Sequence, residues 1–457
     1  MNDKYHDLLL SQKEYFNKNE TKDVQFRINK LIKLKSIILE KDKEISNALK
    51  KDLNKGDFES FACEVMGVID EINYAVKNLK KWAKPKKVKT PLTFFKASSY
   101  IYPEPYGNVL ILTAWNYPFM LAFSPLVGAI AAGNCCIVKP SELAPNTSKI
   151  VKEIIEECFD KNHCAVIEGG VEETTDLLEE RFDFIFYTGS TRVGKIIAKA
   201  AAKELTPVVL ELGGKSPCII DNTVDVELSA KRIAWGKFMN AGQTCVAPDY
   251  ILIHKDVKES FINAMKKCIV EFYGENPEKS VDYGRIVNEK NYDRLVNYIT
   301  KENVVSGGNF IKEDLYIEPT ILDNVTWSHP VMQEEIFGPI LPILEYEDLS
   351  KVISKLHEFE KPLALYIFSK DKKVQKRLLS ELSFGGGCIN ATVQHTGTSY
   401  LPFGGVGNSG IGKYHGKESF RTFSNMKGIL NKSLAIDMKL IYPPFKDKVK
   451  LLKKMYN

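Results

Sequence analysis

The sequence predicts an α/β protein with two domains, each built on a sheet of parallel strands, and a small β arm. Short apolar runs alternate with helical segments from residue 107 to residue 190, and a second region of the same kind begins beyond residue 213. Such alternation is typical of parallel sheets joined by right-handed crossovers. With 457 residues, of which 44% are hydrophobic and 26% charged, the chain is long enough for two or three globular domains.

Helices are expected throughout residues 1–82. Apolar side chains such as Ile28, Leu31 and Ile45 recur there at helical spacing among many Lys and Glu residues, so we interpret these helices as packing elements. From Ala83 to Tyr102 the composition changes to Pro, Lys and Thr and ends in an alternating stretch. This change predicts a linker that leads into an exposed strand.

The region from 107 to 190 predicts the first parallel sheet. Strands are expected at 109–114, 135–140, 164–169 and 182–188, and helices at 120–132, 148–159 and 174–180. Gly133 is expected to end the first of these helices. After the last strand, a turn from Gly189 to Gly194 leads into a helix whose N-terminus suits a dinucleotide phosphate. The turn alone is weak evidence, because it matches neither GxGxxG nor a P-loop.

The second region continues to about residue 410. Strands are expected at 217–220 and 249–254, and helices at 225–239 and 256–273. The tail after Gly410 is expected to be irregular up to the segment 433–442, and a short basic helix is expected to close the chain. That helix has few apolar residues, which favours a solvated helix over contact with an anionic membrane surface.

Charge and cysteine content exclude several classes of protein. The net charge of +5 comes from 63 basic and 58 acidic side chains spread along the chain, without an arginine-rich arm, so no nucleic-acid partner is expected. The nine cysteines contain no CxxC spacing and no cluster with histidine, so we expect neither a disulfide framework nor a metal site. No signal peptide and no apolar run of ~18 residues occurs, which predicts a cytoplasmic protein without a transmembrane anchor.

Cys245, which ends the segment Gly242-Gln243-Thr244-Cys245, is the first candidate for chemistry. A thiolate can add to an electrophilic carbon, and a carboxylate such as that of Glu211 can later activate water. Together they predict covalent catalysis on a carbonyl group. The alternative for a cysteine is a small buried core residue, and this is how we interpret Cys135, Cys136 and Cys218.

Further motifs recur in a fixed order along nearly the full length of the chain. They are Pro105–Gly107, Thr113–Pro118, Lys139–Glu142, Thr188–Ser190 with Gly194, Glu211–Pro217, Gly242–Tyr250, Glu334–Pro339 and Leu401–Phe420. With these motifs the chain resembles the aldehyde dehydrogenase superfamily, and most closely its class 3 branch, which includes fatty-aldehyde dehydrogenases. The resemblance implies a Rossmann-type cofactor domain, an α/β catalytic domain and a β oligomerisation arm.

The resemblance also implies domain boundaries and a partner. The NAD(P)-binding domain would comprise residues 1–82 and 105–212, and the catalytic domain residues 213–410. The arm would comprise residues 83–104 and 430–442, with residues 443–457 as a C-terminal tail. Since the arm of this family joins a partner subunit, a homodimer is expected.

For catalysis, the resemblance implies three residues. Cys245 would be the nucleophile, and the Asn116 amide would stabilise the oxyanion together with the Cys245 backbone N–H. The thiohemiacetal would pass hydride to the nicotinamide, and Glu211 would activate the water that opens the thioester. The plainer alternatives are a turn asparagine and a surface glutamate at a strand end.

For the cofactor, which is NAD or NADP, the resemblance implies three groups of contacts. Lys139 and Glu142 would contact the adenosine ribose, the turn with Gly189, Ser190 and Gly194 the pyrophosphate, and Glu335 with Phe337 the nicotinamide ribose. Each residue also has an ordinary explanation. These are a solvated lysine for Lys139, a helix N-cap for Ser190, a surface charge for Glu335 and a core side chain for Phe337.

The predicted activity is NAD(P)-dependent oxidation of medium- or long-chain aliphatic, or aromatic, aldehydes to carboxylic acids. One alternative is an acylating dehydrogenase that passes the thioester to coenzyme A, although the presence of Glu211 favours hydrolysis. Another is a catalytically silent protein that keeps the scaffold. The choice between NAD and NADP and the length of the substrate stay open, and His395 is either a loop residue or a substrate contact.

Overall fold

The computed structural model describes residues 4–437, 439–446 and 448–456. Its first sheet has six strands in the order β17-β7-β6-β3-β4-β5, all parallel except β17. The strands are β3 (Asn108–Leu112), β4 (Cys135–Lys139), β5 (Cys164–Val166), β6 (Phe184–Thr188), β7 (Val208–Glu211) and β17 (Gly410–Ile411). Every residue of β3, β4 and β6 is buried, as expected for a parallel sheet covered on both faces.

Helices cover both faces of this sheet because successive side chains of a strand point to opposite sides. Val109 and Ile111 of β3 belong to one core cluster, and Leu110 and Leu112 belong to another. The first face carries α6 (Pro118–Ala132) and α7 (Pro145–Cys158), and the second carries α8 (Val171–Glu179) and α9 (Thr191–Lys203). Gly133 ends α6 with a positive φ of 99°, as the sequence predicts.

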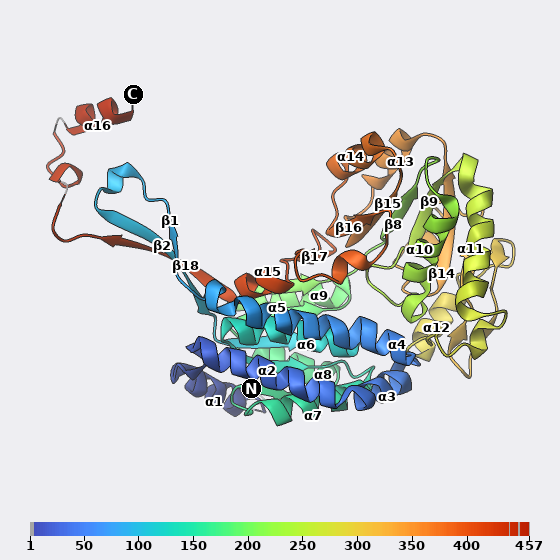
Figure 1. Ribbon diagram of the computed structural model, residues 1–457, viewed down its shortest axis with the longest axis horizontal. Coiled ribbons are helices and arrows are strands. Elements are labelled where there is room, and N and C mark those ends of the chain that lie inside the picture. The colour runs from blue at the N-terminus through green and yellow to red at the C-terminus, as the bar shows by residue number, and fades with distance from the viewer. Residues whose placement is uncertain (1–3, 438, 447, 457) are drawn as a thin grey trace.

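The N-terminal helices form an outer layer on the first face (Figure 1). The N-terminal helices are α1 (His6–Asn17), α2 (Val24–Glu40), α3 (Asp42–Leu53), α4 (Asp57–Ser60), the π-helical turn η2 (Phe61–Val65) and α5 (Met66–Trp82), and all except α1 belong to this layer. Of these, α2 packs on α5, α6 and α7, and α5 packs on α6. The exception is α1, which contacts β3 and β4 and contributes Leu9 to the core of the second face.

The second sheet has seven strands in the order β10-β13-β14-β9-β8-β15-β16, all parallel except β10. They are β8 (Pro217–Ile220), β9 (Tyr250–His254), β10 (Val304–Ser306), β13 (Thr320–Leu322), β14 (Ile340–Tyr346), β15 (Ala364–Phe368) and β16 (Gly386–Ile389). Helices α10 (Val226–Phe238) and α11 (Lys258–Tyr273) pack against each other beside it. The two sheets confirm the predicted α/β class, and the functional division at residue 213 stays a prediction.

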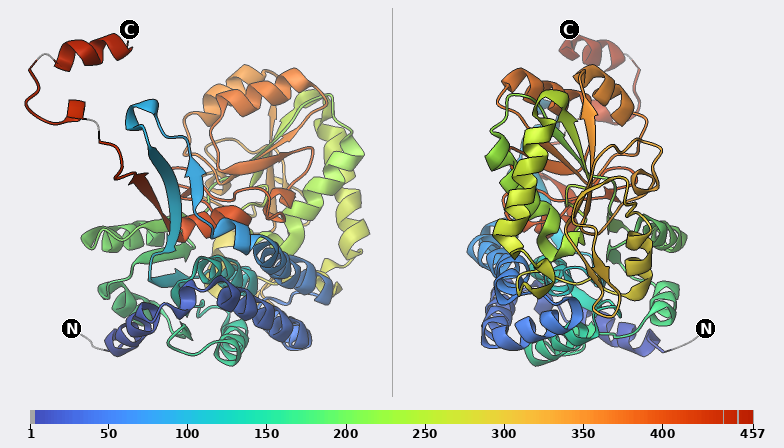
Figure 2. Two further views of the ribbon diagram at one scale, coloured as in Figure 1. Left: turned by 60° about the vertical axis from the view of Figure 1, so that its left-hand side comes forward. Right: turned by 90° about the vertical axis from the view of Figure 1, so that its right-hand side faces the viewer.

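Three antiparallel strands form an arm that projects from the body of the molecule (Figures 1 and 2). They are β1 (Lys86–Val88), β2 (Ala97–Pro105) and β18 (Ser424–Lys432), and α16 (Lys448–Tyr456) follows beyond them. The strand β18 lies earlier in the chain than the expected segment 430–442. The region after Gly410 is also more regular than predicted, because α15 (Gly416–Thr422) packs on α5 and α6.

The reason for this difference is the exposure of β18. All its residues except Ser424 at the start and Lys432 at the end are exposed, so its sequence carries no alternation of buried and solvated side chains. Its place in the sheet is fixed by backbone pairing with β2 along its whole length. Among the described residues, no helix is long and apolar enough to cross a membrane.

Candidate active site

Predicted site residues lie where four strands of the first sheet end. Asn116 follows β3, Lys139 is the last residue of β4, Ser190 follows β6, and Glu211 is the last residue of β7. The chain leaves β3 toward β4 and β5 on one side and continues with β6 and β7 on the other. The carboxyl edge between β3 and β6 is therefore a topological switch point, the place where open α/β sheets bind ligands.

A tight turn brings Cys245 to this edge from the second sheet. After α10, the residues Asn240, Ala241 and Gly242 all have positive φ angles, of 52°, 50° and 74°. A Cβ atom on Gly242 would lie 2.2 Å from the carbonyl oxygen of Gly338, so only glycine fits there. The turn leaves Cys245 half-buried in the wall of a cavity of about 950 Å³, which Asn116 also lines.

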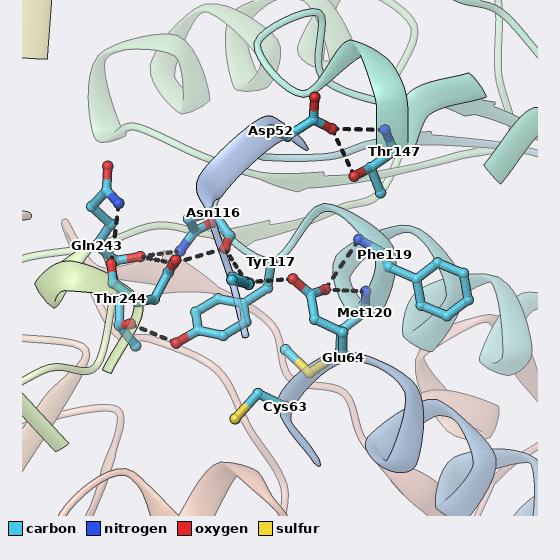
Figure 3. A network of polar contacts seen from close by, with 12 residues as sticks. Asp52, Cys63, Glu64, Asn116, Tyr117, Phe119, Met120, Thr147, Gln243 and Thr244 are labelled. Carbon is cyan, nitrogen blue, oxygen red and sulfur yellow. Dashed lines mark hydrogen bonds and ion pairs between the residues drawn. The ribbon is translucent and has the colours of Figure 1, made fainter. Parts of the chain in front are cut away.

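Polar contacts join the Asn116 loop to the Cys245 loop (Figure 3). The Asn116 amide nitrogen Nδ2 donates to the carbonyl oxygen of Gln243 at 3.1 Å, and the Tyr117 hydroxyl lies 2.7 Å from Thr244 Oγ1. Asn240 Nδ2 donates to the carbonyl oxygens of Asn116 and Gln243, at 2.8 and 3.1 Å. An amide NH₂ has two hydrogens, so Asn116 keeps a second donor for an oxygen in the cavity.

The surroundings of Cys245 raise the pKa of its thiol. Burial of the thiol raises its pKa to about 12, and the charges of Glu335 and Glu211 act in the same direction. The backbone N–H groups of Cys245 and Val246 oppose this effect, because they stabilise a thiolate. Because the raised pKa disfavours the thiolate, attack by Cys245 on a carbonyl carbon requires a base that removes the thiol proton.

The carboxyl group of Glu211 is buried, with 2% of the residue exposed. Neither of its oxygens has a hydrogen-bond partner among the described residues. Burial raises its pKa well above the usual value, and the charge of Lys413 opposes that shift. A carboxyl group with a raised pKa and free lone pairs suits a general base that takes a proton from water.

Glu335 and Phe337 lie on a loop that reaches the same edge. Arg294 holds this loop through the carbonyl oxygens of Glu335, at 3.3 Å, and Ile336, at 2.7 Å. The Phe337 ring packs edge-on against Trp115 with a centroid distance of 5.3 Å, next to Asn116 in the chain. Burial, with a smaller effect of Asp249, raises the pKa of Glu335 to about 8.

The remaining predicted cofactor residues lie around the ends of β4 and β6. Lys139 is 5% exposed, and its Nζ lies 2.9 Å from the Glu142 carboxylate, so it is not a solvated lysine. Ser190 caps α9, since its hydroxyl accepts the N–H of Val193 at 3.4 Å. A Cβ atom on Gly194 would lie 2.7 Å from the Leu212 side chain, so glycine lets α9 approach the end of β7.

These groups fit a dinucleotide. A helix N-terminus offers free N–H groups to phosphates, and an adjacent lysine and carboxylate can bind sugar hydroxyls. His395, in contrast, is buried between the rings of Tyr366 and Phe403, and its Nδ1 lies 3.5 Å from Cys388 Sγ. Its neighbours Gln394 and Thr396 line the cavity.

Two buried charged residues beneath the Asn116 loop, Lys55 and Glu64, carry no signal in the sequence. Both side chains are fully buried and paired with each other. In the sequence they occur in a helical region rich in Lys and Glu, where such residues are normally solvated. A structural role for Gln243 was also not predicted. Its side-chain amide forms hydrogen bonds with the backbone of Asn240, Arg285 and Val287.

The known proteins that this chain resembles are aldehyde dehydrogenases. Residues 4–429 match the model of the Aldehyde dehydrogenase family. The 4,4'-diaponeurosporen-aldehyde dehydrogenase of Staphylococcus aureus (strain NCTC 8325 / PS 47) is 50% identical over 446 residues, which are 97% of each chain. The dimeric NADP-preferring aldehyde dehydrogenase of Mus musculus is 48% identical over 434 residues, 94% of this chain and 96% of that protein.

Among solved structures, the substrate-bound state of Staphylococcus aureus AldH superposes with a TM-score of 0.97. The two chains are 49% identical, and the superposition covers 99% of each. The predicted resemblance and fold are thereby confirmed. The chain belongs to the aldehyde dehydrogenase family.

Proposed function

We propose that this aldehyde dehydrogenase, which uses NAD or NADP, oxidises uncharged aliphatic or aromatic aldehydes to free carboxylic acids through a covalent intermediate on Cys245. The observation that supports this proposal is the shared cavity. Cys245 and Asn116 line it together, and the buried carboxyl group of Glu211 lies close enough to raise the pKa of the thiol. A nucleophile, an oxyanion donor and a base are thus available at one place.

In the first step Cys245 Sγ attacks the aldehyde carbon, and the carbonyl electrons move to the oxygen. The second N–H of the Asn116 amide and the Cys245 backbone N–H stabilise this oxyanion. The thiol proton passes to the carboxylate of Glu335, whose charge acts on the thiol, so the carboxylate of Glu211 stays free for the later hydrolysis. The product of this step is a thiohemiacetal.

A bound NAD or NADP would supply the acceptor for the hydride of the thiohemiacetal carbon. Lys139 with Glu142, the turn formed by Gly189, Ser190 and Gly194, and Glu335 with Phe337 would hold the dinucleotide at the carboxyl edge of the first sheet. A thioester then remains on Cys245. Glu211 takes a proton from water, the water oxygen bonds to the acyl carbon, and the carbon–sulfur bond breaks with its electrons on sulfur.

The cavity wall indicates the class of substrate. Apolar and aromatic side chains dominate it, including Met120, Leu121, Trp235 and Phe272. Among the described lining residues, Glu59, Asp70, Glu71 and Asp282 carry carboxyl groups, and none is Lys or Arg. Such a wall favours neutral apolar aldehydes and disfavours aldehydes that carry a second carboxylate.

A matched pair of substrates tests this proposal. Decanal and 10-oxodecanoate have the same chain length and differ by one terminal carboxylate. With NAD and with NADP, we expect decanal to be oxidised with a kcat/KM at least ~10-fold higher, because like charges in a poorly solvated cavity repel. Free decanoate should form without coenzyme A. Equal use of both aldehydes would contradict the substrate class, and a requirement for coenzyme A would instead support an acylating enzyme.

We further propose that the protein is a cytoplasmic homodimer joined through the arm. Support comes from the dimeric relative and from the edge strands β1 and β18, which leave backbone groups available for a second copy. Light scattering after size-exclusion chromatography should give twice the mass of one chain. A monomer at micromolar concentration would contradict the proposal.

A further inference from the structure

A buried ion pair lies beneath the loop that carries Asn116. Lys55 follows α3, and Glu64 lies in the π-helical turn η2. Both side chains are fully buried, and Lys55 Nζ lies 2.5 Å from Glu64 Oε1. Lys55 is not among the described residues that line the cavity, so the pair acts on the site through other residues.

The pair holds the Asn116 loop at two points. Lys55 Nζ donates to the carbonyl oxygen of Asn116 at 2.9 Å and lies 4.0 Å from the centre of the Tyr117 ring. Glu64 Oε2 accepts the backbone N–H groups of Phe119 and Met120, at 3.1 and 2.9 Å, in the first turn of α6 (Figure 3). The chain from Asn116 to Met120 is therefore tied to one pair of charges.

The segment that carries Lys55 is itself anchored. Asp52, in the last turn of α3, accepts the backbone N–H and the hydroxyl of Thr147 with Oδ2, each at 2.7 Å, at the start of α7 (Figure 3). Lys55 follows three residues later. The backbone of Lys55 is therefore held in place, which allows its side chain to hold the Asn116 loop in place.

Stability alone does not explain such a pair. Removing two charges from water is costly, and well-packed apolar residues of the same volume often serve the fold equally well. Positioning of the Asn116 loop gives a better explanation, because the Asn116 carbonyl oxygen accepts hydrogen bonds from both Lys55 Nζ and Asn240 Nδ2. The backbone of Asn116 is thereby held from one side while its side chain faces the Cys245 loop.

We propose that Lys55, held by Glu64, is a positioning residue that places the Asn116 amide against the oxyanion formed on Cys245. The proposal rests on the role of Asn116 in the proposed function. Its consequence is that Lys55 affects the rate of the reaction only through Asn116. Loss of Lys55 should therefore lower kcat much more than it raises KM, and it should have little effect once the Asn116 amide is gone.

A double-mutant cycle tests this consequence, with K55M, N116A and K55M/N116A assayed for kcat, KM and thermal midpoint in the full-length protein. We expect N116A to lower kcat by ~100-fold or more, as loss of one oxyanion donor does. K55M should lower kcat by ~10- to 100-fold, the cost of misplacing a reacting group by about 1 Å. In the N116A background, K55M should lower kcat by less than about 2-fold.

Two further variants keep the test decisive. K55M/E64M removes both charges and leaves no unpaired buried carboxylate, so it serves if K55M alone fails to fold, and we expect it to show the same loss of kcat. K33M is the matched control, because Lys33 also donates to a main-chain carbonyl, that of Glu157, but contacts no residue of the Asn116 loop among its described hydrogen bonds. It should keep normal kcat.

The outcomes separate the two proposals. A kcat loss from K55M that is equal in the wild-type and N116A backgrounds, or absent in both, would overturn the positioning role while the proposed function stands. Normal kcat in N116A would overturn the role of Asn116 in the proposed function, and the positioning role with it.

Discussion

Replacing Glu211 by Gln separates the chemistry of this carboxyl group from its effect on the fold. Burial raises the pKa of Glu211 from 4.5 to a much higher value, and both oxygens lack partners among the described residues. A carboxyl group with a raised folded-state pKa lowers stability as the pH rises above its unfolded value, because the folded protein resists ionisation. Gln has the same shape as Glu and does not ionise, so E211Q removes this cost to stability. Its free energy of unfolding at pH 7 should be unchanged to within about 1 kcal/mol, or higher.

The kinetic effect of E211Q should be large and confined to one step. A positioned general base contributes ~10²- to 10⁴-fold, so steady-state kcat should fall by at least about 100-fold. The thioester forms before water attacks, so NADH should still appear in a rapid burst of about one equivalent per active site. Stopped-flow absorbance of NADH measures both phases.

The control for this experiment is E204Q, a substitution at an exposed glutamate beyond α9. It should show wild-type steady-state turnover. Normal turnover in E211Q would refute the role of Glu211 as the base. Loss of the burst together with turnover would instead show that Glu211 is needed for the attack of the thiol.

Three further results are expected. C245A should lower turnover at least about 1000-fold while the protein still binds NADH, as measured by fluorescence titration, and substantial turnover would contradict the assigned nucleophile. G242A should lower the free energy of unfolding by about 2 kcal/mol or more and reduce activity, since its Cβ would meet the Gly338 carbonyl at 2.2 Å; a wild-type urea midpoint would contradict the close approach. Burial lowers the pKa of three histidines from 6.5 to about 4, and these are His163, His395 and His415. As the pH falls from ~6.5 to ~4, the unfolded chain therefore binds protons before the folded protein does. The free energy of unfolding should fall by about 1.4 kcal/mol per pH unit for each histidine. In H163F the urea midpoint should change less with pH, and an unchanged dependence on pH would contradict this origin.

The sequence predicted those parts of the molecule whose signal is local. Strand and helix alternation identified the parallel sheets, because a strand buried on both faces reads as a short apolar run. Cys245 and Glu211 stood out because each lies beside glycines, in Gly242–Cys245 and Glu211–Gly214. Motifs of this kind depend on neighbours in the chain, which a single sequence displays.

The parts that were not predicted depend on distant partners. Lys55 contacts Asn116, a residue 61 positions away, and its surroundings in the sequence are those of a solvated helix. The strand β18 has no buried face and pairs with β2 through its backbone. Neither residue type nor spacing marks such contacts, because the same Lys, Glu and Asn residues are common on surfaces.

The most direct measurement is the mass of the intermediate trapped in E211Q. The variant is incubated with decanal and NAD, quenched in acid after the NADH burst, digested, and analysed by mass spectrometry. A decanoyl group should be found on the peptide that contains Cys245, and C245A/E211Q should carry none. NADH formation without an acyl group on Cys245, or with the acyl group on another residue, would contradict covalent catalysis by this thiol.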